Sequence, residues 1–136
     1  MNAKTEELLN RTFNFGIKNL QFLSKLPENY IYNVPKRQLA RSSTSIGANY
    51  EEAQVAESKK DFIHKVAICC KESRESLYWL KVLNEIYLNT TNQNIFNELI
   101  KEAAQLKKIF ISIKLSAENK TGKNVNPDSK DSNFKP

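Results

Sequence analysis

The hydrophobic residues of this chain recur every three or four positions, and no long stretch shows the clean period of two that is typical of a strand. A first segment of this kind runs from about Thr5 to Leu26, and Pro27 disfavours further helix. Spacing of this kind places side chains on one face of a helix. The members of the row are Leu9, Phe13, Ile17, Leu20 and Leu23. The pattern predicts a first helix that buries this row.

A second helix is expected from about Lys36 to Glu57, because Pro35 suits a helix start. Tyr30 and Ile31 are expected to form a short turn before it. The segment contains RSSTSIGANYEEA, residues 41 to 53, which is rich in weak helix formers. On a helix its small residues would let a partner helix approach closely. A polar stripe lies beside them: Gln38, Arg41, Ser45, Asn49 and Glu52.

A third helix is expected to begin after Ser58, which precedes Asp61 in a typical capping pattern, and to reach about Leu88. The polar run KESRES, residues 71 to 76, interrupts its apolar face. If the two polar patches lie at one height, Arg41 can pair with a glutamate of this run. The predicted interhelix polar network is Gln38, Arg41, Ser45, Asn49, Glu52, Glu72, Ser73 and Glu75.

A fourth helix is expected from about Thr91 to Ala117, after the polar break NTTNQN. Its apolar positions repeat every seven residues in two adjacent rows, which is the pattern of a bundle seam. These rows are Leu99, Leu106 and Ile113, and Phe96, Ala103 and Phe110. Four such helices with short connections predict an all-α, up-down-up-down four-helix bundle over residues 1–118. The polar, Gly- and Pro-containing residues 119–136 are expected to be a disordered tail.

Composition agrees with one small globular domain. The chain has 136 residues, of which 40% are hydrophobic and 26% charged. No apolar run approaches the ~18 residues of a membrane span, and the N-terminus is polar and acidic. A cytoplasmic location without membrane contact is therefore expected.

The net charge of +6 is compatible with a phosphate-bearing partner such as RNA or DNA. Each basic residue can equally be part of a solvated helix face. The candidate nucleic-acid contacts are Lys36, Arg37, Lys59, Lys60, Lys107, Lys108 and Lys114.

The sequence offers no constellation for catalysis or metal binding. Cys69 and Cys70 are adjacent on a helix and point about 100° apart, so they cannot face one metal, and they are expected to be buried reduced thiols. His64 is the only histidine and does not follow a glutamate by three residues, as a di-metal bundle site requires. We expect a nonenzymatic protein without cofactors, with His64 on a helix surface or core edge.

Two stretches, QLARSSTSIGANYEEA and DFIHKVAICCKESRESLYWLKVL, resemble the bacterial four-helix bundle proteins encoded in ribosomal RNA intervening sequences, the S23-type ribosomal protein family. The resemblance covers about residues 5–117. Many relatives have Glu-Gly where Glu52 is followed by Ala53, and others have Gly-Ser at Glu72 and Ser73. The matching positions are Gln38, Arg41, Ser45, Ile46, Asn49, Glu51, Glu52, Phe62, Ile63, Glu72, Ser73, Glu75, Trp79 and Leu80.

The resemblance implies a homopentamer. Tyr78, Trp79 and Val82 would widen the apolar arc of the third helix beyond one seam, so they are candidate oligomer contacts. Related accessory proteins of diversity-generating retroelements bind nucleic acid and a reverse transcriptase through such a ring. Two hypotheses follow: a nonenzymatic homo-oligomer that associates with RNA or other nucleic acid through a basic ring surface, or a protein-interaction scaffold that binds no nucleic acid.

Overall fold

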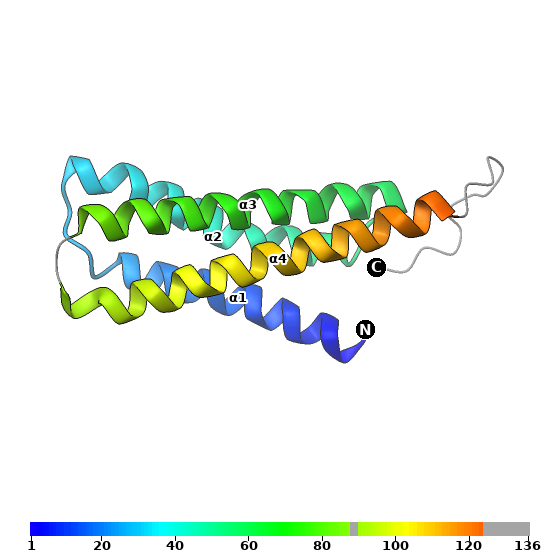
Figure 1. Cartoon of the computed structure of the whole chain (residues 1–136), viewed down its shortest axis with the longest axis horizontal. Helices are drawn as coiled ribbons and strands as arrows, with labels where there is room; N and C mark the ends of the chain where they lie inside the picture. Colours follow the sequence, from blue (N-terminus) through cyan, green and yellow to red (C-terminus); the bar gives the residue numbers. More distant parts are fainter. Residues whose placement is uncertain (88–89, 124–136) are drawn as a thin grey trace.

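The computed structural model describes residues 1–87 and 90–123, which form four antiparallel helices lying side by side (Figure 1). The helices are α1 (Ala3–Leu23), α2 (Tyr30–Ala53), α3 (Lys59–Ile86) and α4 (Gln93–Lys123). A short 3-10 turn, η1 (Thr90–Asn92), precedes α4. Along the described residues, the backbone of each helix lies close only to those of its neighbours, and the α1 backbone approaches α4 over a far shorter length than it approaches α2. This is the up-down-up-down bundle that the hydrophobic pattern predicts.

Side-chain caps fix where three of the helices begin. Asn2 accepts from the Thr5 backbone N–H at 2.8 Å, and Asn29 accepts from that of Tyr32 at 2.9 Å. Ser58 accepts from the Asp61 N–H at 3.0 Å, as the capping pattern predicts. Each cap satisfies a donor that the helix itself leaves without a partner.

The predicted start of the second helix is wrong by six residues. α2 begins at Tyr30, and Pro35 lies inside it. The Asn29 cap starts the helix earlier, and proline at this place removes only the hydrogen bond to the carbonyl of Ile31. Ile31 is 57% exposed, so water can reach that turn. A strong cap therefore decides the start of α2 in place of the proline.

The predicted buried row of the first helix is also wrong for three residues. Phe13, Ile17 and Leu20 are 65%, 38% and 41% exposed. A second row faces the core, and it escapes the hydrophobic pattern because it contains polar residues. That buried row is Leu8, Thr12, Phe15, Asn19, Phe22 and Leu23. α1 is therefore rotated about its axis relative to the prediction, with an apolar row left outside.

Close approach to α2 helps explain this rotation. A Cβ at Gly47 would lie 3.3 Å from the carbonyl carbon of Thr12, and a Cβ at Gly16 would lie 3.4 Å from the carbonyl oxygen of Ser43. Asn19 is fully buried beside this contact, and its amide nitrogen donates to the Phe15 carbonyl at 2.7 Å. The glycines let the α1 and α2 backbones pack on small residues.

The two rows of α4 form the seam, as predicted. Five of the six predicted positions are buried, and Ile113 is half-buried. Phe96 packs edge-on against Phe22 of α1 at 4.8 Å between ring centroids, and Phe110 packs in the same way against Tyr50 of α2 at 5.3 Å. Aromatic contacts thus join α4 to α1 and, across the core, to α2.

The described part of α4 ends at Lys123, five residues into the stretch predicted to be a tail. Ala117 is buried, the three residues after it are half-buried or exposed, and the helix continues beyond them. Residues 124–136 of the predicted tail lie outside the described residues. Within the described part of the chain, no helix is both long and apolar enough to span a membrane.

Candidate functional site

Arg41 of α2 joins two glutamates of α3. Its Nη1 donates to Glu72 Oε2 at 3.1 Å, and its Nη2 donates to Glu75 Oε1. The Glu72 side chain is only 7% exposed, whereas that of Arg41 is 51% exposed. The acid therefore lies inside the bundle and the guanidinium closes over it from the edge.

Glu75 links this ion pair to the indole of Trp79. The Arg41 guanidinium holds the pKa of Glu75 below its usual range, and the Trp79 Nε1–H, which donates to Glu75 Oε1 at 3.2 Å, acts in the same direction. Glu75 therefore stays ionised and fixes the indole through a charged hydrogen bond.

The other predicted members of the polar network form separate local bonds. The Asn49 amide donates to the backbone and side-chain oxygens of Ser45, both at 2.9 Å. Glu52 pairs with Lys65 of α3, and Ser73 donates to the Cys69 carbonyl at 2.7 Å. Gln38 is half-buried one turn before Arg41. The eight residues thus do not form a single connected network.

A buried serine pair joins α2 and α3 at a place that sequence reasoning did not single out. Ser76 Oγ donates to Ser42 Oγ at 2.9 Å, and both residues are fully buried. Only the register of the two helices reveals this pair, because nothing in the sequence distinguishes Ser42 and Ser76 from the other serines of the two segments. The bonds of Arg41 to Glu72 and Glu75 are here called the charged fork. Together with the charged fork, the serine pair gives polar side chains of the α2–α3 contact partners within the bundle.

The cysteines are free thiols with different burial. Cys69 is fully buried, and burial raises its pKa to about 12, so it is a neutral thiol at ordinary pH. Cys70 is only half-buried, in contrast to the prediction that both are buried. His64 is exposed on α3. Among the residues with described positions, no three His, Cys, Asp or Glu side chains gather as a metal-ligand set.

All exposed residues of α3 lie on one stripe, here called the α3 stripe. Its members are Lys60, His64, Lys71, Arg74, Tyr78, Lys81 and Glu85. The distance from Lys60 to Lys81 along the helix axis is ~32 Å at about 1.5 Å per residue. In the described part of the chain, none of its four cations forms an ion pair. The stripe is therefore basic until Glu85 at its end.

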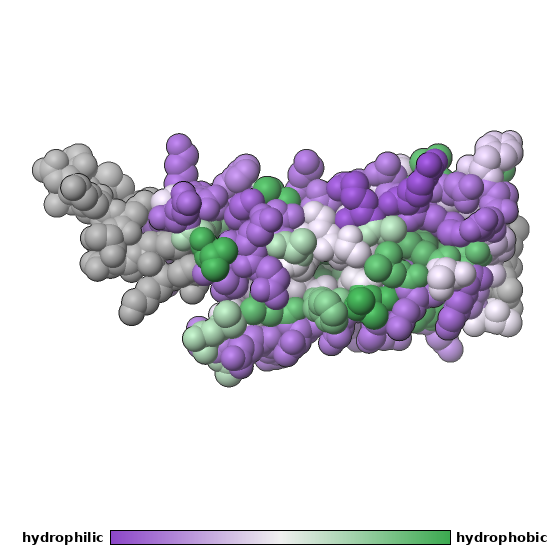
Figure 2. Space-filling model, turned by 180° about the vertical axis from the view of Figure 1, so that it is seen from behind, coloured by the Kyte–Doolittle hydropathy of each residue, from purple (hydrophilic) through white to green (hydrophobic). Residues whose placement is uncertain are grey.

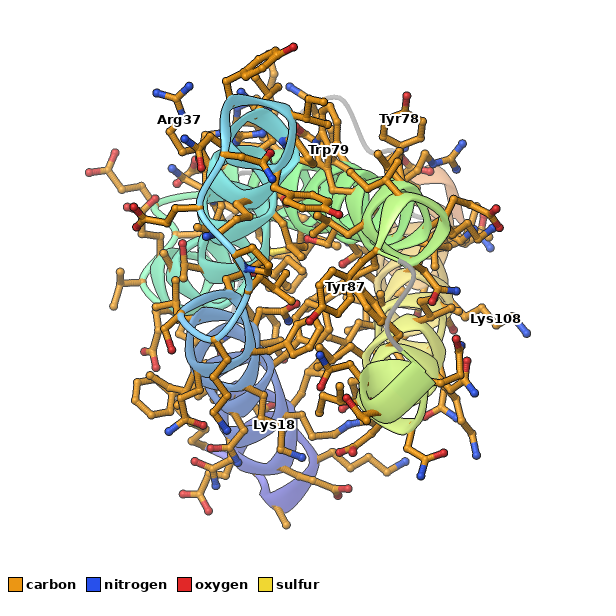
Figure 3. The ribbon with its side chains drawn as sticks, turned by 90° about the vertical axis from the view of Figure 1, so that its left-hand side faces the viewer. Lys18, Arg37, Tyr78, Trp79, Tyr87 and Lys108 are labelled. Carbon is orange, nitrogen blue, oxygen red and sulfur yellow. The ribbon has the colours of Figure 1, made fainter. Side chains whose placement is uncertain are left out.

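α4 adds cations beside this stripe. Lys114 and Arg74 both lower the pKa of Cys70 against the larger effect of burial, which places both near the α3–α4 border. Lys107 lies two turns before Lys114 on the same face of α4. Lys108 is exposed, and Figure 3 shows it pointing outward from α4 while Tyr78 points outward from α3. We call the α3 stripe together with these three lysines the α3–α4 basic face.

The other predicted nucleic-acid contacts lie elsewhere. Lys36 donates to the carbonyls of Leu26 and Pro27 at 3.3 and 3.4 Å and so closes the α1–α2 connection. Arg37 points outward from α2, on a different side from Lys108 (Figure 3). Lys59 is half-buried at the start of α3. Sequence reasoning also missed Lys71, Arg74 and Lys81, although their helical spacing was a visible signal.

The three candidate oligomer contacts do not form one exposed patch. Tyr78 is 58% exposed, but Trp79 is half-buried against the core and Val82 is half-buried. An exposed and mainly apolar row lies instead on the opposite helix, α1. Its members are Asn10, Phe13, Ile17 and Leu20, and we call it the α1 outer face. Figure 2 shows hydrophobic side chains gathered along α1 and beside α2 on this side of the molecule.

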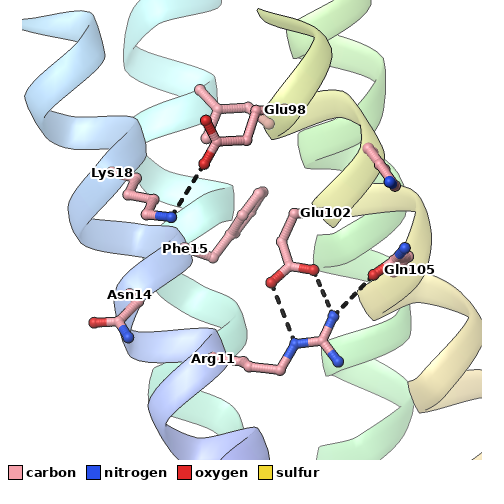
Figure 4. Close-up of a pocket in the computed structure, with 9 residues that line it drawn as sticks. Arg11, Asn14, Phe15, Lys18, Glu98, Glu102 and Gln105 are labelled. Carbon is pink, nitrogen blue, oxygen red and sulfur yellow. Dashed lines mark hydrogen bonds and ion pairs between the residues drawn. The ribbon is translucent and has the colours of Figure 1, made fainter. Parts of the chain in front are cut away.

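The charged residues in the middle of α1 turn away from that face and toward α4. Arg11 donates to both carboxylate oxygens of Glu102, and Lys18 donates to Glu98 at 3.1 Å (Figure 4). Glu102 raises the pKa of Arg11 by this hydrogen bond. The two ion pairs bridge a cleft of about 310 Å³ between α1 and α4, with Phe15 and Leu99 at its base. They leave the α1 outer face without charge.

These features define a small all-helical bundle whose middle helices are joined by a charged fork and a serine pair. The family model of the 23S rRNA-intervening sequence protein matches residues 4–112, and the chain belongs to this family. A crystal structure of a protein with unknown function from the S23 ribosomal protein family of Bacteroides thetaiotaomicron is similar, with a TM-score of 0.73 and 30% identity. That match covers 82% of this chain and 98% of the other. No curated protein matches significantly.

Proposed function

We propose that this protein is a nonenzymatic, self-associating bundle that binds nucleic acid through the α3–α4 basic face. The observation that carries the proposal is the α3 stripe, where the exposed residues of one helix include four cations without ion pairs. Other cations, such as Arg11 and Arg41, are held by glutamates inside the bundle. The stripe therefore presents charge that the fold itself does not use.

The dimensions of the stripe suit a phosphate backbone. A stretch of ~32 Å corresponds to about nine phosphates of one strand at the ~3.4 Å spacing of duplex DNA. Lys107, Lys108 and Lys114 of α4 widen the face to one side. A cationic strip of this kind recognises charge and shape in preference to base sequence.

The α1 outer face supports the self-association part of the proposal. Protein interfaces are enriched in aromatic residues and depleted of charge in their centres, and Phe13, Ile17 and Leu20 fit that description. Copies with a net charge of +6 repel one another, so an uncharged face favours their contact. The family resemblance implies a homopentamer as the resulting assembly.

A second candidate function rests on the same face. A scaffold protein could use the α1 outer face to dock a different protein and bind no nucleic acid. A partner that stays bound after nuclease treatment, together with no affinity for RNA, would favour this alternative. Loss of the partner with the nucleic acid would favour the first proposal.

The direct test is a fluorescence-anisotropy titration with a labelled ribosomal RNA hairpin. We expect binding at ~50 mM salt that weakens steeply by ~200 mM. The double variant Lys71→Glu and Arg74→Glu should bind at least about tenfold more weakly, with a shallower salt dependence. The matched control, Lys25→Glu and Arg37→Glu, makes the same charge change away from the basic face and should bind within about threefold of the wild type. No binding at ~50 mM, or equal losses in both variants, would refute the proposal.

A further inference from the structure

Tyr78 lies in the C-terminal half of the α3 stripe, between two cations. Arg74 lies one turn before it and Lys81 one turn after it on the same face. The ring is 58% exposed and points away from the bundle (Figure 3). A large aromatic side chain is thus open to solvent between two cations of the α3 stripe.

The Tyr78 ring rests on a neighbour that is itself fixed. It meets the Trp79 ring edge-on, with centroids 4.9 Å apart and an interplanar angle of 73°. Trp79 is held by Glu75, and Glu75 by Arg41. The bonds of Arg41 to Glu75 and of Glu75 to Trp79 therefore hold the ring against which Tyr78 packs, which reduces the entropy lost when a ligand covers Tyr78.

We propose that Tyr78 is a stacking platform for an unpaired base of single-stranded nucleic acid, with the flanking phosphates on Arg74 and Lys81. This inference rests on the proposed nucleic-acid function and names the form of the ligand. Surfaces that bind single strands combine a cationic track with exposed aromatic rings, because each base offers a flat face. Bases inside a duplex are already stacked on both sides, so a regular duplex cannot use the ring in this way.

Exposure alone does not single out Tyr78. Tyr30 is 83% exposed, but it is the first residue of α2 and does not belong to the α3 stripe. Among the aromatic residues that the structure describes, only Tyr78 combines exposure, flanking cations and a fixed aromatic support. Tyr30 therefore provides a matched control for the loss of an exposed tyrosine ring.

Trp79 supplies the measurement, because it is the only tryptophan of the chain. Single-stranded RNA and DNA of about 12 nucleotides, and a duplex of the same length, would be titrated at ~50 mM salt while Trp79 fluorescence and labelled-strand anisotropy are recorded. We expect both single strands to bind more tightly than the duplex and to change the Trp79 emission. Loss of one stacked base corresponds to about 1–3 kcal/mol, so Tyr78→Ala should weaken binding ~5- to 150-fold.

Two further variants separate stacking from charge. Tyr78→Phe keeps the ring and should bind within about twofold of the wild type, as should Tyr30→Ala. Tyr78→Ala should leave the slope of affinity against salt unchanged, because no phosphate contact is removed. The inference is overturned if Tyr78→Ala binds like the wild type, or if the duplex binds as tightly as the single strands. In either case salt-dependent binding still supports the proposed function, whereas absence of all binding refutes both.

Discussion

At the scale of the residue, Arg41 does the most to specify how α2 meets α3. Its guanidinium bonds Glu72, which is nearly buried, and Glu75, which orients Trp79. The sequence predicts a pairing of Arg41 with Glu72 or Glu75 on the condition that the two polar patches lie at one height in the bundle, and the structure meets that condition. The sequence cannot show that Glu52 pairs with Lys65, because that depends on the register between the helices.

Arg41→Ala should therefore leave Glu72 without its charge partner. We expect the free energy of unfolding, measured by urea denaturation at neutral pH, to fall by about 2–3 kcal/mol. This is less than the ~3–5 kcal/mol of a fully buried pair, because half of the Arg41 side chain already faces water. Arg37→Ala, one turn away on the exposed surface, should change stability by under about 0.5 kcal/mol. Equal losses in the two variants would show that the fork adds no stability.

At the scale of the element, the contact between α1 and α2 depends on small residues. Gly47 faces the Thr12 and Phe13 backbone so closely that a Cβ there would lie 3.3 to 3.4 Å from backbone atoms. These small residues look like weak helix formers in the sequence, yet they set how near the two helices lie. Gly47 thus lowers the helix propensity of α2 but allows the α1 backbone to approach closely.

Gly47→Leu should force α1 away from α2. Replacing a glycine inside a helix favours the helix by about 1 kcal/mol. Overpacking against α1 outweighs this gain, so we expect the free energy of unfolding to fall by about 1–3 kcal/mol. Ala48→Leu places the same side chain on the adjacent exposed position and should be nearly neutral. Thermal and urea unfolding of the two variants would compare them directly. A Gly47→Leu protein as stable as Ala48→Leu would show that α1 can move without cost.

The hydrophobic pattern predicts the four helices and the seam of α4, but it misjudges the buried face of α1. α1 carries two possible apolar rows, and the row that is buried contains Thr12 and Asn19. Periodicity ranks rows by their hydrophobicity and cannot include the close backbone contact at Gly16 and Gly47. The α3 stripe, in contrast, follows helical spacing and was predictable in principle once its cations were placed on a wheel.

At the scale of the whole molecule, the two sides of the bundle differ in character. The α3–α4 basic face presents the cations of the α3 stripe, which form no ion pair with any described residue, and the α1 outer face presents uncharged and apolar side chains. The separation allows one side to associate with other copies while the other remains open to nucleic acid. If cations and apolar residues were mixed on one side of the bundle, the two contacts would compete for the same surface.

Self-association through the α1 outer face gives a clear expectation for mass. Light scattering of the wild type should give a multiple of the 15.7 kDa chain, and Phe13→Asp with Ile17→Asp should reduce it to a single chain. The matched control is Val55→Asp with Leu115→Asp. Val55 lies just beyond the end of α2 and Leu115 lies on α4, and both are exposed apolar residues outside the α1 outer face. This control should keep the wild-type mass. A monomeric wild type, or a control that dissociates equally, would contradict the expectation.

The weak contact between α1 and α4 has a thermodynamic consequence. α1 is held mainly by α2 on one side, and on the other by two ion pairs and the Phe22–Phe96 ring contact. It is therefore the helix whose docking has the least support among the described residues of one chain. Copies that bind the α1 outer face would bind only chains in which α1 is docked, and mass action then adds to the stability of that state. Under the proposed self-association, the midpoint of unfolding would rise with protein concentration, and dilution alone would loosen α1.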